Sequence, residues 1–140
     1  MLSSIYNQKV TILNKLKRAD SGQNVDVWYK TVIEDAAWYA QVARTVSNGN
    51  VLIGSYIRCL IPHHEEYLNY YDWKQPNAQD GHYTMSSGDY IVLGEVTEDI
   101  APGNVVQVMT KYEPNVCLVK HVEELHDRFN SYVQLRIEGA

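Results

Sequence analysis

Apolar and polar residues alternate with a period of two along several short stretches of the chain, a pattern typical of half-buried β-strands. Two such stretches, at residues 10–12 and 25–28, flank a polar segment that contains one glycine. They predict a hairpin with a long turn at residues 15–24. A further strand is expected at residues 38–42, where Trp38, Ala40 and Val42 share one face.

The rest of the chain continues this pattern. Ser-Asn-Gly-Asn at residues 47–50 predicts a turn, because Asn-Gly accepts a positive φ at little cost. A strand at residues 51–61 would end at Pro62, since proline cannot donate to the sheet. Strands are also expected at residues 90–96, 116–122 and 132–138. The last has the cleanest alternation, which predicts that Val133, Leu135 and Ile137 point inward.

One helix is predicted, at residues 101–112. Val105, Val108 and Met109 recur at helical spacing, Pro102 suits a first turn, and Pro114 would end the helix. Six or more short strands with one short helix indicate a mainly β protein, either a small β-barrel or a sandwich. The length of 140 residues predicts a single domain over residues 1–140.

Residues 62–81 form a long excursion that is both polar and aromatic. Four aromatic residues within seven positions argue against disorder: Tyr67, Tyr70, Tyr71 and Trp73. The whole chain has eleven Tyr and three Trp but a single Phe. Because Tyr and Trp are enriched where a partly wet surface contacts a partner, this usage favours an interaction protein.

The net charge of −5 argues against a broad basic face for nucleic acid. The main basic cluster is Lys15, Lys17 and Arg18 at the predicted turn, which a solvated turn explains, although a local contact to DNA stays open. An oligonucleotide-binding barrel with exposed aromatic residues is a further alternative. Acidic residues flank the aromatic ones, however, and oppose that reading.

Catalytic and cofactor motifs are missing from the sequence: there is no GxSxG, GxGxxG or P-loop pattern. Cys59 and Cys117 lie in apolar runs and are expected to be buried and reduced. The cluster at residues 63–66, His-His-Glu-Glu, lacks a second ligand pair at zinc spacing. We therefore expect no enzyme activity, no metal and no cofactor. No apolar run approaches the length of a membrane span, and no secretory signal is present.

Several of these segments carry a resemblance. The Val-Thr-Ile strand at residues 10–12, the polar turn with Gly22, then Trp28 and the Trp-Tyr-Ala strand at 38–40 resemble the small head-tail joining proteins of tailed bacteriophages. GDYIVLGEV at residues 88–96 and KYEPNVCLVKHVEEL at 111–125 look like related prophage proteins of Gram-positive bacteria.

The resemblance implies a virion structural protein, the head-closure or stopper component, assembled in the host cytoplasm and located in the virion neck. It implies a homo-oligomeric ring, six-fold or twelve-fold, between the portal or adaptor and the tail terminator or tail tube. DNA would pass only transiently, and no membrane is involved. We expect contacts at residues 15–24 and 63–81, through Lys15, Lys17, Arg18, Tyr67, Tyr70, Tyr71 and Trp73. A tail terminator or tail-completion protein, which also forms rings, is the main alternative.

Overall fold

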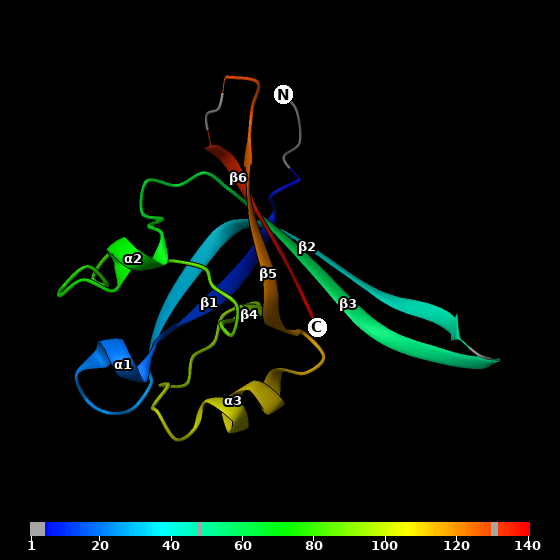
Figure 1. Cartoon of the computed structure of the whole chain (residues 1–140), viewed down its shortest axis with the longest axis horizontal. Coiled ribbons are helices and arrows are strands. Elements are labelled where there is room, and N and C mark those ends of the chain that lie inside the picture. The colour runs from blue at the N-terminus through cyan, green and yellow to red at the C-terminus, as the bar shows by residue number, and fades with distance from the viewer. Residues whose placement is uncertain (1–4, 48, 130–131) are drawn as a thin grey trace.

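A computed structural model describes residues 5–47, 49–129 and 132–140 and has a closed, antiparallel β-barrel at its centre (Figure 1). The barrel order is β1-β2-β3-β6-β5-β4, and β4 pairs back with β1 to close it. The mainly β barrel predicted from the sequence is confirmed. The strands are β1 (Gln8–Leu16), β2 (Val27–Ser47), β3 (Asn50–Pro62), β4 (Tyr90–Leu93), β5 (Val116–His126) and β6 (Tyr132–Gly139).

β2 is one continuous strand of 21 residues, so the prediction of separate strands at 25–28 and 38–42 was wrong. Its first half pairs with β1, and its second half, from Ala37 onward, pairs with β3. Ala36 and Ala37 stand where the pairing changes, and both are buried. Two consecutive buried residues interrupt the alternation on which the sequence prediction relied. A register shift in β1 between Gln8 and Val10 accompanies this corner.

β2 and β3 continue beyond the barrel as a two-stranded ribbon (Figure 1). β6 covers β3 from Ile57 to Pro62, and β1 covers β2 up to Ala36. Residues 41–47 and 50–56, called the β2–β3 ribbon below, lie past these pairings and pair with each other. Gly49, with a φ of +79°, lies in the predicted turn at 47–50, of which Asn48 is outside the described residues.

Side chains from all six strands fill the barrel interior. Cys59 and Cys117 are fully buried and are not disulfide-bonded, as predicted. Leu135 and Ile137 also point inward, which confirms that part of the β6 prediction. Val133 does not, because 44% of it is exposed. It lies where the pairing of β5 and β6 shifts register, because Leu125 pairs with Gln134 and His126 with Tyr132, so that Val133 falls between the two pairs.

A second apolar cluster lies on the outside of the barrel, under α3 (Val105–Tyr112). Val105, Val108 and Met109 of α3 are buried together with Leu13 of β1 and Val92 of β4. Leu13 and Val92 follow Ile12 and Ile91, which face the interior, as the alternation of a strand requires. The helix therefore covers the outer face of β1 and β4.

α3 is shorter than the helix predicted at residues 101–112. The Asn104 side chain accepts a hydrogen bond from the Ala101 N–H at 2.8 Å and donates one to the Asp99 carbonyl at 3.1 Å. Asparagine often competes with the helix for backbone groups in this way, and here it holds residues 101–104 in a turn. Pro102 consequently precedes the helix and does not occupy its first turn.

Two further helices, each four residues long, correct the prediction of a single helix: α1 (Arg18–Ser21) and α2 (Tyr70–Trp73). One turn is too short to produce a helical periodicity in the sequence. The Asn69 side chain caps α2 by accepting a hydrogen bond from the Asp72 N–H at 3.0 Å. In the described part of the chain, no helix is long and apolar enough to cross a membrane.

Some strand boundaries also differ from the prediction. β4 ends at Leu93, three residues early, because Gly94 adopts a φ of +98°, which a strand does not accommodate. β5 and β6 extend to His126 and Gly139, beyond the predicted ends. β1 runs to Leu16, so residues 15 and 16 belong to a strand and not to the predicted turn.

Candidate interaction surface

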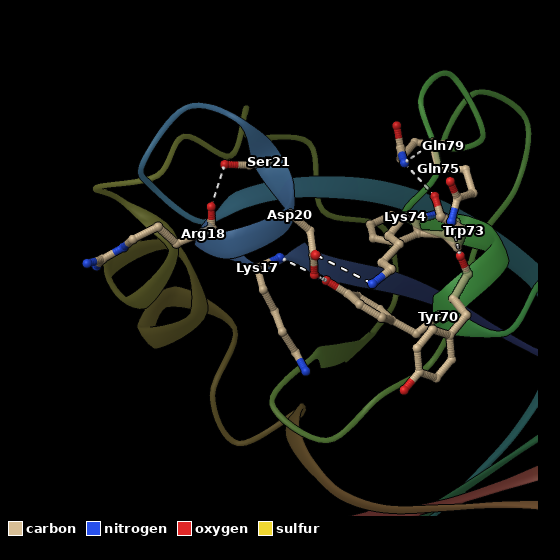
Figure 2. A network of polar contacts seen from close by, with 10 residues as sticks. Lys17, Arg18, Asp20, Ser21, Tyr70, Trp73, Lys74, Gln75 and Gln79 are labelled. Carbon is tan, nitrogen blue, oxygen red and sulfur yellow. Dashed lines mark hydrogen bonds and ion pairs between the residues drawn. The ribbon is translucent and has the colours of Figure 1, made fainter.

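The segments 15–24 and 62–81, predicted separately as contact regions, meet on the side of the barrel away from the ribbon (Figures 1 and 2). The Tyr70 hydroxyl donates a hydrogen bond to Oδ2 of Asp20 at 2.7 Å and accepts one from the Lys17 backbone N–H at 3.1 Å. Nζ of Lys74 lies 3.5 Å from Oδ1 of Asp20. We call the resulting area the α1–α2 surface, made of Lys17, Arg18, Asp20, Tyr70, Tyr71 and Lys74.

Asp20 is the electrostatic centre of this surface. The hydrogen bond from Tyr70 is the main reason that the pKa of the Asp20 carboxyl lies below its usual value, and Lys74 and Lys17 lower it further. Burial raises the pKa of Tyr70 to about 12, so this hydroxyl keeps its proton and remains a donor at neutral pH. The pairing between the two segments therefore holds across the physiological pH range.

Two lysine ammonium groups lie over tyrosine rings on this surface. Nζ of Lys17 is 4.9 Å from the centre of the Tyr70 ring, and Nζ of Lys74 is 5.1 Å from that of Tyr71. Both distances are within the range of cation–π attraction. Tyr71 is 75% exposed, and Arg18, the first residue of α1, is also exposed. The surface thus presents two lysine ammonium groups, held over tyrosine rings, next to the exposed ring of Tyr71.

Trp73, predicted as a contact residue, is instead a buried anchor. It has no exposed surface. Its ring meets Tyr29 of β2 edge-to-face, with the ring centres 5.5 Å apart and an interplanar angle of 89°. It also packs against Tyr70, at 6.0 Å between centres. Trp73 fixes α2 to the barrel wall and, in this conformation, cannot itself touch a partner.

Lys15 and Tyr67, also predicted as contact residues, have different surroundings. Lys15 lies in β1 opposite Trp28, with its ammonium 6.0 Å from the centre of the indole. Tyr67 packs on Tyr83 at 5.8 Å between ring centres and donates a hydrogen bond to Glu124 of β5 at 3.3 Å. Of the seven predicted residues, Lys17, Arg18, Tyr70 and Tyr71 therefore come together on one surface, where Tyr70 is half-buried and the other three are exposed.

A buried carboxylate ties β1 to the turn at residues 86–89. Asp89 is 2% exposed and accepts hydrogen bonds from the N–H groups of Lys15 at 3.0 Å and Ser86 at 2.9 Å. It also accepts one from the side-chain amide of Asn14 at 3.0 Å. Burial outweighs these donors and raises the pKa of Asp89 to about 6. The network fixes the end of β1 directly before α1.

Asp20 and Lys74 were not among the predicted contact residues. Both are ordinary charged residues in polar segments, and they meet only because α1 and α2 fold against the same side of the barrel. The α1–α2 surface is suited to binding. Its lysine and arginine side chains can donate hydrogen bonds to carboxylate or phosphate oxygens, and its tyrosine rings can pack against apolar or planar groups. Among the described residues, no group of three or more His, Cys, Asp or Glu side chains is placed to hold a metal ion.

Comparison with known protein families shows the family to which the chain belongs. A family model described as "Family of unknown function (DUF6751)" matches residues 5–140 of the chain. No curated protein and no solved structure matches it.

Proposed function

We propose that this chain, which belongs to that family of unknown function, is a structural protein of a tailed-phage particle. In this proposal it is the head-closure or stopper component, which forms a ring in the virion neck between the portal or adaptor and the tail. Such a role needs no catalytic residue. It needs a lateral contact between identical copies and a separate surface for a neighbouring protein.

The β2–β3 ribbon carries the proposal. A two-stranded ribbon on its own is at best marginally stable in water. Within the described residues, its strands hydrogen-bond only to each other, so both outer edges are open to another chain. Soluble proteins usually protect such edges with lysine or proline. The ribbon has neither, and Arg44 is its one charged residue among five large apolar ones, Val42, Val46, Val51, Leu52 and Ile53.

This composition favours burial of the ribbon against a second copy. In this proposal the ribbon contacts a different face of the neighbouring copy, which makes the contact heterologous, and repeated heterologous contacts close into a ring when the rotation permits. The α1–α2 surface lies on the opposite side of the barrel from the ribbon (Figure 1). It therefore stays available for the adaptor, for the tail, or for DNA that passes through the ring.

The direct test is cryo-electron microscopy of the neck of a phage that encodes this chain, or of the protein mixed with its portal and adaptor. We expect density for the chain as a ring between adaptor and tail. A neck that lacks the chain contradicts the proposal. A ring stacked on the tail tube without contact to an adaptor would instead identify a tail terminator.

Substitutions in the β2–β3 ribbon test whether it makes the lateral contact between copies. Leu52→Asp and Ile53→Asp each place a carboxylate at an apolar position of the ribbon. We expect at least one to abolish ring assembly while circular dichroism and thermal unfolding remain close to those of the parent protein. Val106→Asp is the matched control, because Val106 is an apolar residue of α3 that is 65% exposed. Equal assembly of both ribbon variants and the control would overturn the lateral role of the ribbon.

A further inference from the structure

A groove of about 940 Å³ lies beside the barrel, between residues 29–35 of β2 and the segment from His64 to Tyr83. We propose that it is a binding site for an alkyl chain that ends in an ammonium or guanidinium group. The proposal does not depend on the function proposed above. It follows from the hydrogen-bond acceptors of the lining, from its negative charge and from the aromatic side chain in its wall.

Three side chains at the groove, Asp35, His64 and Tyr83, form a chain of hydrogen bonds. Nε2 of His64 is 2.8 Å from Oδ2 of Asp35, and Nδ1 of His64 is 2.8 Å from the hydroxyl of Tyr83. Since a carboxylate only accepts, Nε2 carries the proton, and the Nδ1 of a neutral ring then accepts from Tyr83. Both ring nitrogens are thus engaged. This chain of hydrogen bonds engages Oδ2 of Asp35 and holds the carboxylate in place. Its other oxygen, Oδ1, can then accept a hydrogen bond from a ligand.

The other histidine of the groove is held in a similar way. Nδ1 of His82 lies 3.1 Å from the carbonyl of Ala78 and 3.0 Å from that of Asp80, so Nδ1 is the donor and Nε2 of a neutral ring is an acceptor. Lys30 is the one lysine or arginine among the described lining residues. Its ammonium donates at 3.0 and 3.1 Å to the carbonyls of Val96 and Glu98, which are not part of the lining.

The groove therefore presents mainly acceptors. Glu34, Asp35, Glu66 and Asp80 contribute carboxylates to the lining, which contains the single lysine Lys30. Glu34 also lies 3.9 Å from Nζ of Lys9, outside the lining, so Asp35, Glu66 and Asp80 carry the argument. Several carboxylates in one groove favour a ligand that carries several N–H donors and a positive charge, because such charge-assisted hydrogen bonds are the stronger ones; an ammonium and a guanidinium both meet this description.

The walls suit the rest of such a ligand. Tyr29 and Val32 line the groove between the polar groups, whereas Tyr83 and Ile33 lie behind this wall and are almost wholly buried. Aromatic faces attract cations, and alkyl stems pack on apolar side chains while the charged end stays with polar groups. The volume lies within the usual range for small-ligand sites. An alkyl stem with a cationic end fits both parts of the lining.

The cation has two possible sources, a free amine or an arginine side chain of a protein partner, and two probes separate them. Agmatine is a small free cation with an ammonium and a guanidinium, and acetyl-Gly-Arg-Gly-amide carries one arginine in a capped peptide. We expect at least one to bind in isothermal titration calorimetry and to shift the NMR signals of Tyr29, Tyr83 and His82. Tighter binding of agmatine would identify the natural ligand as a small amine, and tighter binding of the peptide would identify it as an arginine side chain of a protein partner. Either result supports the groove.

Neighbouring glutamates provide a matched pair of variants. Glu66 lines the groove, whereas Glu65 is not among the lining residues, and both are exposed. Glu66→Gln should weaken binding roughly threefold, as for a partly screened ion pair, and Glu65→Gln should leave it unchanged. Asp35→Asn should weaken it about tenfold, because it removes a charge-assisted hydrogen bond. Failure of both probes to bind, or equal weakening by Glu65→Gln and Glu66→Gln, would overturn the proposal.

Discussion

The Tyr70 hydroxyl donates a hydrogen bond of 2.7 Å to the Asp20 carboxylate and so joins two helices that are 50 residues apart in the sequence. The same oxygen accepts the Lys17 N–H, so one side chain of α2 satisfies both a side-chain and a backbone group next to α1. Figure 2 shows how Lys74 reaches the same carboxylate. The half-buried Tyr70 side chain therefore holds the two segments of the α1–α2 surface together, although they are far apart in the sequence.

Removal of that hydroxyl should separate the two helices without disturbing the barrel. In Tyr70→Phe we expect the pKa of Asp20 to rise toward its ordinary value of 3.8, because its main stabilising hydrogen bond is lost. The free energy of unfolding should also fall, because the hydrogen bonds to the Asp20 carboxylate and from the Lys17 N–H are both lost. Carboxyl-detected NMR titration measures the first effect, and urea denaturation the second. Tyr71→Phe, which alters a 75% exposed tyrosine, is the control and should change neither.

Trp73 should contribute more to stability than any exposed residue of the surface it supports. Trp73→Ala leaves a cavity between α2 and Tyr29, and we expect the free energy of unfolding to fall by about 3–5 kcal/mol. Tyr71→Ala in the same helix should change it by less than about 0.5 kcal/mol, because that side chain is largely in water. Equilibrium urea unfolding of both variants tests this. Similar losses in the two would mean that Trp73 does not anchor α2.

Asp89 should make stability depend on pH. Its pKa in the folded protein, about 6, is above the ordinary value of 3.8, so the folded state binds the proton more tightly than the unfolded state. The associated stability is fully present below about pH 4 and is lost as the pH rises through 6, about 2–3 kcal/mol in total.

Asp89→Asn is the reference for this measurement, because every other titrating group is common to both proteins. The free energy of unfolding of the parent protein, minus that of the variant, should decrease between pH 4 and pH 7. A difference that is constant, or that increases over this range, would contradict the raised pKa. Urea denaturation at half-unit steps of pH provides the data.

Gly139 in β6 is required by packing. A Cβ at this position would lie 2.1 Å from the Leu118 carbonyl oxygen and 2.8 Å from Sγ of Cys117, closer than atoms can approach. Gly139→Ala must therefore displace the β5 backbone, and we expect a loss of about 2 kcal/mol or more.

Gly103, in the turn before α3, is the matched control for this substitution. It has open space around its Cβ position and no positive φ. Gly103→Ala should be neutral, or stabilising by up to about 1 kcal/mol, because alanine restricts the unfolded chain. Thermal unfolding of the two variants side by side makes the comparison. An unchanged melting temperature in Gly139→Ala would show that β5 can move away at little cost.

The sequence predicted the parts of the structure that depend on local periodicity. Alternation placed Leu135 and Ile137 in the core and predicted a barrel or sandwich, because a strand with one buried face repeats every two residues. Helical spacing located α3, since Val105, Val108 and Met109 must face one side. Apolar neighbours predicted that both cysteines are buried.

Other features required the tertiary structure. The unbroken course of β2 could not be predicted, because the chain turns a corner at Ala36 and Ala37 and the alternation fails where the pairing partner changes. Tyr67, Tyr70, Tyr71 and Trp73 look equivalent in sequence, yet one is fully buried, one is mostly exposed and the other two are partly covered.

By itself, therefore, the sequence determined that the fold is mainly β and which face of α3 and of most of β6 is apolar, since these follow from the chemistry of neighbouring residues. Only the tertiary structure decided that Asp20 meets Tyr70 and that His64 joins Asp35 to Tyr83. Contacts of this kind join residues 19 to 50 positions apart, and their formation depends on closure of the barrel, which no local pattern encodes.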